Sequence, residues 1–181
     1  ANRAALERTA ASGCQVVVAT GRLLRAVPQA LLDLPFLRYF ILMNGAQVLD
    51  RETGEVLYRC EIPLETAKQV FDLVASRALT RASRLPVDDL WTAVCARGDT
   101  VQKIQMYFPH LELRPQVMAL LRRETPELVQ SISMPSNLEL NAPGATKGAA
   151  LGALCRTLGL SPQDVIAFGA GTNDISMLQS A

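Results

Sequence analysis

Residues 15–22, with the sequence QVVVATGR, place an apolar run directly before a Thr-Gly turn. A short apolar run that ends at a turn signal is typical of a buried strand. Residues 165–174, VIAFGAGTND, show a similar pattern, in which an apolar run is followed by two glycines and the start of a helix. Both stretches place small polar groups and backbone N–H groups just past the carboxyl end of a strand. Ligands bind at that edge of an open α/β sheet, so we expect the two turns to form halves of one anion site.

The segments around residues 15–22 predict a parallel sheet. Residues 1–12 are rich in Ala, Leu, Glu and Arg, which favour a helix. Residues 23–32 carry apolar pairs at helical spacing, although Pro28 fits a helix interior poorly. Residues 40–43 form another apolar run, which predicts a second strand. The order helix, strand, helix, strand indicates parallel pairing through right-handed crossovers.

The pattern changes over residues 49–136, which we expect to form a small antiparallel α+β module inserted into the parallel domain. The expected elements are a hairpin, two helices and four more strands, over residues 46–59, 64–79, 115–124, 90–96, 101–107, 128–133 and 137–141. A helix follows Thr146, and a last buried strand is expected over residues 165–168. The predicted domains are therefore 1–48 with 137–181, and the insertion 49–136.

The composition narrows the class of protein. Hydrophobic residues make up 49% of the 181 residues and charged residues 19%, as in a globular chain, and the formal net charge is +1. A charge this small gives no reason to expect nucleic acid or an anionic membrane as a partner. No apolar stretch approaches the roughly 18 residues of a membrane span. The four cysteines are widely spaced without a Cys-x-x-Cys pair, which favours free thiols in the cytoplasm.

Three short motifs are candidates for binding an anion. Thr20 and Gly21 offer a hydroxyl and backbone N–H groups after a strand, although many strands end this way. Asn44 and Gly45 follow the next strand, but Asn-Gly is also an ordinary hairpin turn. Lys147 lies where a loop enters a helix, and the helix dipole disfavours a cation there. An anion between the two would relieve that repulsion; the alternative is a solvated lysine.

Two nucleotide-binding motifs do not fit. A Walker loop that ended at Lys147 would need glycines at the positions of Asn141 and Thr146. The glycines at 169 and 171 follow a predicted strand, as in a dinucleotide fingerprint, but Asp174 occupies the third glycine position.

In this order the motifs resemble the haloacid dehalogenase (HAD) superfamily, and within it the Cof-type sugar-phosphate phosphatases with a C2-type cap. The matching stretches are residues 17–22, 44–46, 146–148 and 166–178. The last is similar to the family's Gly-Asp-x-x-Asn-Asp-x-x-Met-Leu turn. The resemblance spans essentially the whole chain. It implies an α/β Rossmann-like core, a parallel sheet flanked by helices, with an α+β cap domain at 49–136.

The resemblance also implies an activity, which is Mg²⁺-dependent hydrolysis of small phosphorylated metabolites, such as sugar phosphates, through an aspartyl-phosphate. Thr20 would hydrogen-bond the transferred phosphoryl group as a catalytic residue, and Lys147 would neutralise its charge. The implied phosphate-binding residues are Thr20, Gly21, Arg22, Asn44, Gly45, Lys147 and Asn173. Asp174 would act on the metal through its water shell. Cap residues would select the leaving group.

The chain departs from the family pattern at its first motif. Asp-x-Asp-Gly-Thr, which carries the nucleophile, is absent, and the sequence begins in the helix that normally follows it. We therefore expect a segment of a longer protein, without turnover of its own. The absent strand normally lies between the strands at residues 15–19 and 165–168, so we expect both to have unpaired edges.

A second departure is Ala170, which occupies the position of a direct Mg²⁺ ligand in the family. Alanine offers no oxygen, and the loss of a carboxylate should weaken a site for a hard cation severely. A natural inactive relative, an engineered substitution and a decayed gene would each explain it. The alternative function is therefore a catalytically dead pseudo-phosphatase that binds phosphate or a phosphorylated metabolite.

Overall fold

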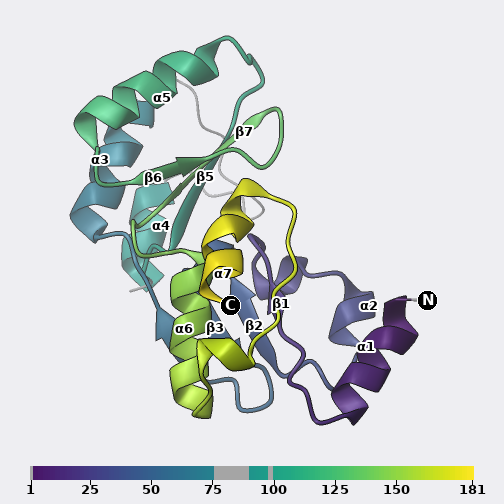
Figure 1. Cartoon of the computed structure of the whole chain (residues 1–181). Coiled ribbons are helices and arrows are strands. Elements are labelled where there is room, and N and C mark those ends of the chain that lie inside the picture. Colours follow the sequence, from purple (N-terminus) through teal and green to yellow (C-terminus); the bar gives the residue numbers. More distant parts are fainter. Residues whose placement is uncertain (1, 76–89, 98–99) are drawn as a thin grey trace. The chain divides into compact units, whose positions relative to one another are not determined.

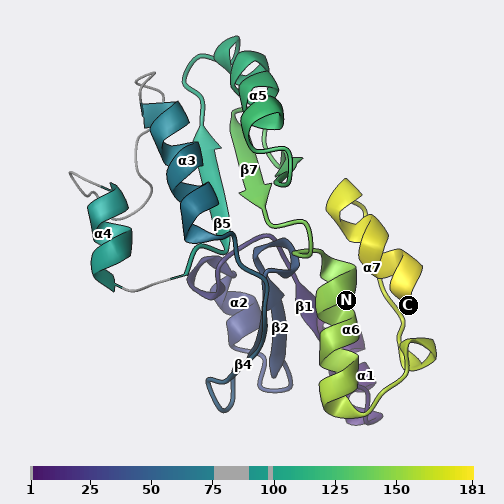
Figure 2. The ribbon, with the colours of Figure 1, turned by 90° about the vertical axis from the view of Figure 1, so that its left-hand side faces the viewer.

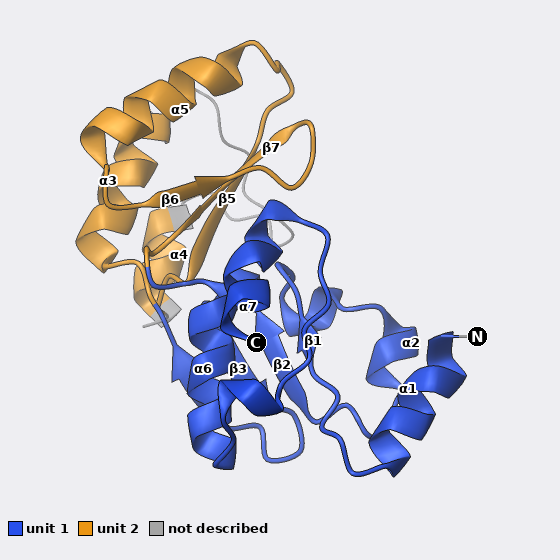
Figure 3. Cartoon of the chain, in the orientation of Figure 1, with its two compact units in different colours: residues 1–60, 144–181 blue, residues 61–143 orange. Residues whose placement is uncertain are grey.

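The apolar run near residue 40 becomes β2 (Tyr39–Leu42), whose four residues are all buried in the computed structural model (Figure 1). The structure describes residues 2–75, 90–97 and 100–181. The chain divides into two compact units (Figure 3). Unit 1 consists of residues 1–60 and 144–181, and unit 2 of residues 61–143.

Unit 1 is built on a four-stranded sheet in the order β1-β2-β3-β4. β1 (Val18–Ala19) pairs with β2 in parallel, in the register Val18 to Phe40. β3 (Gln47–Asp50) and β4 (Val56–Arg59) continue the sheet as the antiparallel hairpin that the sequence predicts. The expected α/β class with parallel strands is confirmed.

Helices cover this sheet from one side. α6 (Lys147–Leu158) contacts β2, β3 and β4, and α7 (Ile175–Ser180) packs along α6 (Figure 1). Buried side chains of these elements form one core cluster that includes Ile41, Val48 and Leu154. The other helical segments of unit 1 are α1 (Asn2–Ala11), α2 (Gln29–Leu32) and the 3₁₀ turns Leu24–Ala26, Met43–Gly45, Pro162–Asp164 and Thr172–Asp174. α1 has no buried residue.

The continuous helix expected over residues 23–32 is wrong. The segment is a 3₁₀ turn at Leu24–Ala26, an extended Val27-Pro28 link and the single turn of α2. Proline lacks the N–H that a helix interior needs, and it biases the preceding residue toward extended backbone. Val27 accordingly has φ −70° and ψ 136°.

The buried strand expected over residues 165–168 is also wrong. Among the described residues, no backbone hydrogen bond joins residues 166–169 to another segment. Val165 and Ala167 pack against the core cluster, whereas Ile166 is 82% exposed and Phe168 85% exposed. The alternation is that of a strand, but no neighbouring strand pairs with it. β1 likewise spans only two of the five residues expected to be extended there.

Unit 2 is a three-stranded antiparallel sheet with helices. Its strands β5 (Lys103–Tyr107), β7 (Asn137–Asn141) and β6 (Val129–Ser131) lie in the order β5-β7-β6. α3 (Leu64–Ala75) and α5 (Leu113–Glu124) run alongside this sheet (Figure 2). Gln69 of α3 donates to the carbonyl oxygen of Glu124, at the end of α5. The expected last four residues of the first helix, 76–79, lie outside the described residues.

One expected strand of this unit is a helix instead. Residues 90–96 belong to α4 (Leu90–Arg97), and the Trp91 ring lies 6.5 Å from the ring of Phe71 on α3. A short apolar run does not distinguish a strand from a buried helix by its periodicity, and tertiary packing decides.

The two chain crossings between the units lie next to each other in unit 1. The Tyr58 hydroxyl donates to the carbonyl oxygen of Gly144 at 3.4 Å, and a Cβ on Gly144 would lie 3.1 Å from the Cys60 sulfur. The unit boundaries at 60/61 and 143/144 differ from the expected 48/49 and 136/137. The hairpin β3–β4 stays with β2 because it extends the same sheet.

Candidate active site

Lys147 is the first residue of α6, directly after the N-cap Thr146, whose hydroxyl oxygen accepts from the backbone N–H of Ala149. Its side chain is 6% exposed, and its Nζ lies 2.5 Å from Oδ1 of Asp174. A buried ammonium next to the positive end of a helix dipole needs a close counter-charge. In this structure the Asp174 carboxylate is that counter-charge.

Asp174 uses both carboxylate oxygens. Oδ1 faces Lys147, and Oδ2 accepts from the backbone N–H groups of Ala170 at 3.0 Å and Gly171 at 2.9 Å. Burial by itself raises the pKa of Asp174, but the hydrogen bonds from Lys147 and the two backbone groups, with the lysine charge, hold that pKa below its ordinary value. The carboxylate thus closes the turn between Phe168 and α7.

Residues 20–22, which we call the Thr20 turn, are hydrogen-bonded to the end of β2 and to the residues that follow it. The Thr20 N–H donates to the carbonyl oxygen of Ile41 at 2.8 Å, which continues the parallel pairing of β1. The Thr20 hydroxyl oxygen accepts from the N–H of Arg22 at 3.2 Å. In return, Asn44 N–H donates to the carbonyl of Thr20, and Met43 N–H donates to that of Arg22.

Met43, Asn44 and Gly45 form a turn with three successive positive φ angles, 51°, 63° and 104°. The left-handed region disfavours side chains other than those of Asn, Asp and Gly, so Met43 is strained. Gly45 is required by space as well, because a Cβ there would lie 2.1 Å from the carbonyl oxygen of Thr146. We call residues 43–45 the left-handed turn.

The side chain of Asn44 connects this turn to two other segments. Its Oδ1 accepts from Nδ2 of Asn173 at 3.2 Å. A Cβ on residue 21 would lie 2.5 Å from the same oxygen, so a larger residue than Gly21 would displace the Asn44 side chain. The left-handed turn therefore contacts the Thr20 turn, the start of α6 and the segment before α7.

Most of the residues predicted for the site are thereby brought into one network within unit 1: Thr20, Gly21, Asn44, Gly45, Lys147, Asn173 and Asp174. Arg22 is different. Its side chain is exposed and donates from Nη1 to the carbonyl oxygen of Ala26, with no hydrogen bond to the other residues of this network.

A search against protein-family models finds a match over residues 1–91 and 95–181 to the family described as haloacid dehalogenase-like hydrolase. The chain belongs to this family. The match confirms the resemblance on which the sequence analysis rests.

The relatives described next are longer than this chain. It is 27% identical over 183 residues to 5-amino-6-(5-phospho-D-ribitylamino)uracil phosphatase YcsE of Bacillus subtilis (strain 168), covering 99% of this chain and 72% of that protein. Among solved structures, a haloacid dehalogenase-like hydrolase from Bacteroides thetaiotaomicron superposes with a TM-score of 0.86 at 21% identity, covering 99% of this chain and 77% of the other. The HAD subclass IIB sugar phosphatase BT4131 superposes with a TM-score of 0.76 at 21% identity, over 98% and 75% of the two chains.

The residues of this turn do not fit the magnesium ion that the family resemblance implies. Ala170 offers no side-chain oxygen, and its N–H is used by Asp174. Both oxygens of Asp174 are already bonded to Lys147 and to the turn. Nowhere in the described ranges do three His, Cys, Asp or Glu side chains gather as metal ligands. A hard divalent cation needs several oxygen ligands, which this turn does not supply.

Two residues of the site were not singled out from the sequence. Ser176 accepts from the N–H of Gly148 through its Oγ at 3.1 Å and so fixes α7 against the first turn of α6. A serine early in a helix usually caps its own helix, so its sequence position gave no sign of this contact. The sequence predicts Met43 only as part of an apolar strand, and its left-handed backbone has no sequence signal.

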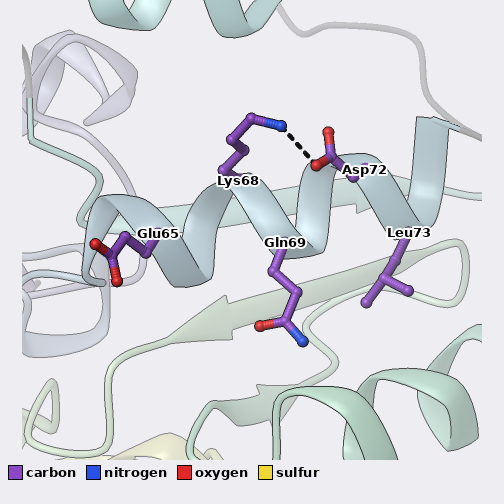
Figure 4. Close-up of a pocket in the computed structure, with 5 residues that line it drawn as sticks. All are labelled: Glu65, Lys68, Gln69, Asp72 and Leu73. Carbon is purple, nitrogen blue, oxygen red and sulfur yellow. Dashed lines mark hydrogen bonds and ion pairs between the residues drawn. The ribbon is translucent and has the colours of Figure 1, made fainter.

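A shallow hollow of about 480 Å³ lies elsewhere, along α3 in unit 2 (Figure 4). Glu65, Lys68, Gln69, Asp72 and Leu73 line it, and Lys68 and Asp72 form an ion pair at 2.6 Å. None of the predicted site residues lines this hollow. In the part of the chain that the structure describes, no helix is both long and apolar enough to cross a bilayer.

Proposed function

We propose that this chain is the phosphate-binding body of a phosphatase that acts on small phosphorylated metabolites. The observation that carries the proposal is the convergence of the Thr20 turn, Asn44, Lys147 and Asn173 at the carboxyl end of β1. A buried lysine and backbone N–H groups beside a strand end are the chemistry by which α/β folds hold phosphate. The YcsE relative is itself named as a phosphatase of a phosphorylated compound.

Each residue has a distinct role in this proposal. Lys147 neutralises phosphate charge, and a phosphate oxygen shares its ammonium with Asp174. The Thr20 hydroxyl and the Gly21 backbone donate to phosphate oxygens, and Asn173 donates from its amide. Electrostatic stabilisation by such preorganised donors is usually the largest contribution to catalysis of charge-building reactions.

Among the described residues, this network holds no carboxylate in a position to attack a phosphate. Asp174 is the one carboxylate bonded to the network among the described residues, and its two oxygens are engaged. We propose that a strand carrying an aspartate nucleophile lies between residues 15–19 and 165–168. β1 is at the edge of its sheet, and residues 166–169 have no backbone partner among the described residues. The 181-residue chain by itself is then without turnover.

Ala170 favours a second candidate, a pseudo-phosphatase that binds phosphate or a phosphorylated metabolite and hydrolyses nothing. In the first candidate, magnesium binding depends on oxygen ligands outside the turn. In the second, the phosphate is held by Lys147 and the N–H donors without a metal. Both candidates assign unit 2 as the cap that selects the organic part of the ligand, as the resemblance implies.

The proposed location is the cytoplasm. Cys14, Cys60, Cys95 and Cys155 are free thiols, the state that a reducing compartment maintains. A small phosphorylated metabolite is the proposed partner.

Release of inorganic phosphate from a panel of sugar phosphates and other small phosphate monoesters tests the function. The 181-residue chain should release none, with or without Mg²⁺, but should bind inorganic phosphate in a ³¹P NMR titration that Lys147→Ala abolishes. Hydrolysis by the full-length natural protein favours the phosphatase, and binding without hydrolysis favours the pseudo-phosphatase. If phosphate binds the chain equally with and without Lys147, both candidates are wrong.

Ala170→Asp separates the two candidates further. In a phosphatase limited by its metal site, this change in the full-length protein should increase Mg²⁺-dependent hydrolysis, because it restores a carboxylate ligand. Ala170→Asn is the matched control, since it has similar size and a weaker, neutral oxygen donor. An unchanged rate in both variants shows that Ala170 is not the limiting defect.

A further inference from the structure

The left-handed turn is the most strained segment of the site. Non-glycine residues at positive φ are energetically unfavourable and persist where the surroundings force them. Here Met43 and Asn44 adopt that region in succession, and both are buried, at 5% and 7% exposure. The hairpin that follows does not require this geometry, because β3 begins only at Gln47.

The strained backbone has a consequence for Asn44. It turns the peptide so that two successive N–H groups donate to the carbonyls of Thr20 and Arg22, on either side of Gly21. It also places the Asn44 amide oxygen against Gly21 and within 3.2 Å of Asn173 Nδ2. One residue thus holds the Thr20 turn through its backbone and Asn173 through its side chain.

We infer that Asn44 is a positioning residue of the phosphate site, acting by orienting the Asn173 amide toward the anion that Lys147 also faces. The inference rests on the proposed function for the nature of the ligand, a phosphate group. Asn173 is exposed at the start of a 3₁₀ turn, and among the described residues the only hydrogen bond of its side chain is the one to Asn44. Without that acceptor, the Asn173 side chain can rotate away from the site.

The energetic argument concerns preorganisation. An unrestrained asparagine amide loses rotamer freedom when it binds an anion, whereas one already held loses little. The loss of a single neutral hydrogen bond changes a binding constant by up to about tenfold. The expected effect of losing Asn44 is therefore about a tenfold weaker phosphate affinity, with the fold retained.

Asn44→Gly is the test variant, because glycine adopts positive φ without strain and removes only the amide. In the 181-residue chain, a titration with inorganic phosphate should give about a tenfold higher Kd for this variant. In an Asn173→Ala background, the same change should alter Kd by less than about twofold, because the amide that Asn44 orients is gone. Asn141→Gly, an equally drastic change in β7, controls for general destabilisation and should leave Kd unchanged.

A spectroscopic readout separates positioning from a structural role. The side-chain ¹⁵NH₂ resonance of Asn173 should shift in Asn44→Gly without phosphate, and Asn44→Asp, which keeps an acceptor oxygen, should retain the hydrogen-bonded signature. An Asn173 resonance that is the same in wild type and Asn44→Gly overturns the inference. The inference is also overturned if the effects of Asn44→Gly and Asn173→Ala on the phosphate Kd simply add in the double variant. Absence of phosphate binding by the wild type refutes the proposed function instead, and the Asn173 resonance then still decides the inference.

Discussion

The Nζ atom of Lys147 lies 2.5 Å from Oδ1 of Asp174, across 27 residues of sequence, and the two side chains are 6% and 13% exposed. This pair joins the amino end of α6 to the turn before α7. Asp174 is at the same time the acceptor that holds the N–H groups of Ala170 and Gly171. Any anion that binds Lys147 must therefore share it with this carboxylate.

Lys147→Met should destabilise the chain by about 3 kcal/mol, because it leaves the largely buried Asp174 carboxylate without its counter-charge. Urea unfolding followed by circular dichroism measures the loss. Lys147→Met combined with Asp174→Asn removes both charges and should recover much of it. A double variant as unstable as the single one would show that packing of the lysine stem, rather than charge, is what matters.

Acid should destabilise unit 1 through two aspartates. The Arg38 hydrogen bond holds the pKa of Asp50 below its ordinary 3.8, against the effect of burial, and the pKa of Asp174 is also lowered. A lowered native pKa means that the carboxylate stabilises the fold fully above about pH 5, and that this contribution is lost as pH falls through the native pKa.

The pH dependence of thermal unfolding between about pH 5 and about pH 2 checks this prediction. Asp50→Asn and Asp174→Asn should each flatten the curve in that range while lowering stability at neutral pH. A slope equal to that of the wild type in both variants would contradict the assignment.

Gly45→Ala should be severely destabilising, by at least about 3 kcal/mol, because it adds a clash to an unfavourable φ. The new methyl group would lie 2.1 Å from the carbonyl oxygen of Thr146. Gly54→Ala is the control, since Gly54 also has a positive φ of 76° but has open space around it. Its cost should be about 1 kcal/mol. Chemical denaturation compares the two, and equal losses would refute the close approach.

Phe168→Ser should change the free energy of unfolding of the 181-residue chain by less than about 0.5 kcal/mol, because Phe168 is 85% exposed. The same variant should reduce self-association and dye binding, since it removes exposed apolar surface. Met177→Ala, in the core cluster, should instead cost about 3 kcal/mol. Denaturant unfolding and light scattering measure both effects. A large loss of stability in Phe168→Ser would place that ring in a core.

Prediction from the sequence succeeded for elements whose apolar periodicity and flanking turn residues indicate the same structure. β2, the hairpin β3–β4, α6 and α5 were all expected near their observed positions. Prediction failed where the structure of a segment depends on another segment that pairs with it or packs against it. Residues 165–168 have the composition of a buried strand, but a strand exists only when another pairs with it, and α4 took its form from packing on α3.

In the candidate site, too, some features could be predicted from local sequence and others could not. Thr-Gly, Asn-Gly and a lysine at a helix start are each weak anion signals. Their residues could be chosen because the order of the motifs along the chain resembles the family. The strain at Met43 and the hydrogen bond between Asn44 and Asn173 depend on a backbone conformation that no local pattern announces. Arg22 illustrates the converse, because adjacency to Thr20 did not bring its side chain into the network.

The contact between Tyr58, Cys60 and Gly144 has an evolutionary consequence. Because the chain leaves and re-enters the sheet-bearing unit at neighbouring points, 83 residues from 61 to 143 could be deleted and the ends rejoined by a short link without reordering any host strand. Such a junction lets recombination exchange one inserted module for another while the chemistry at the sheet edge is inherited unchanged. If unit 2 selects the ligand as proposed, lineages can in this way diversify what they recognise independently of what they do to it.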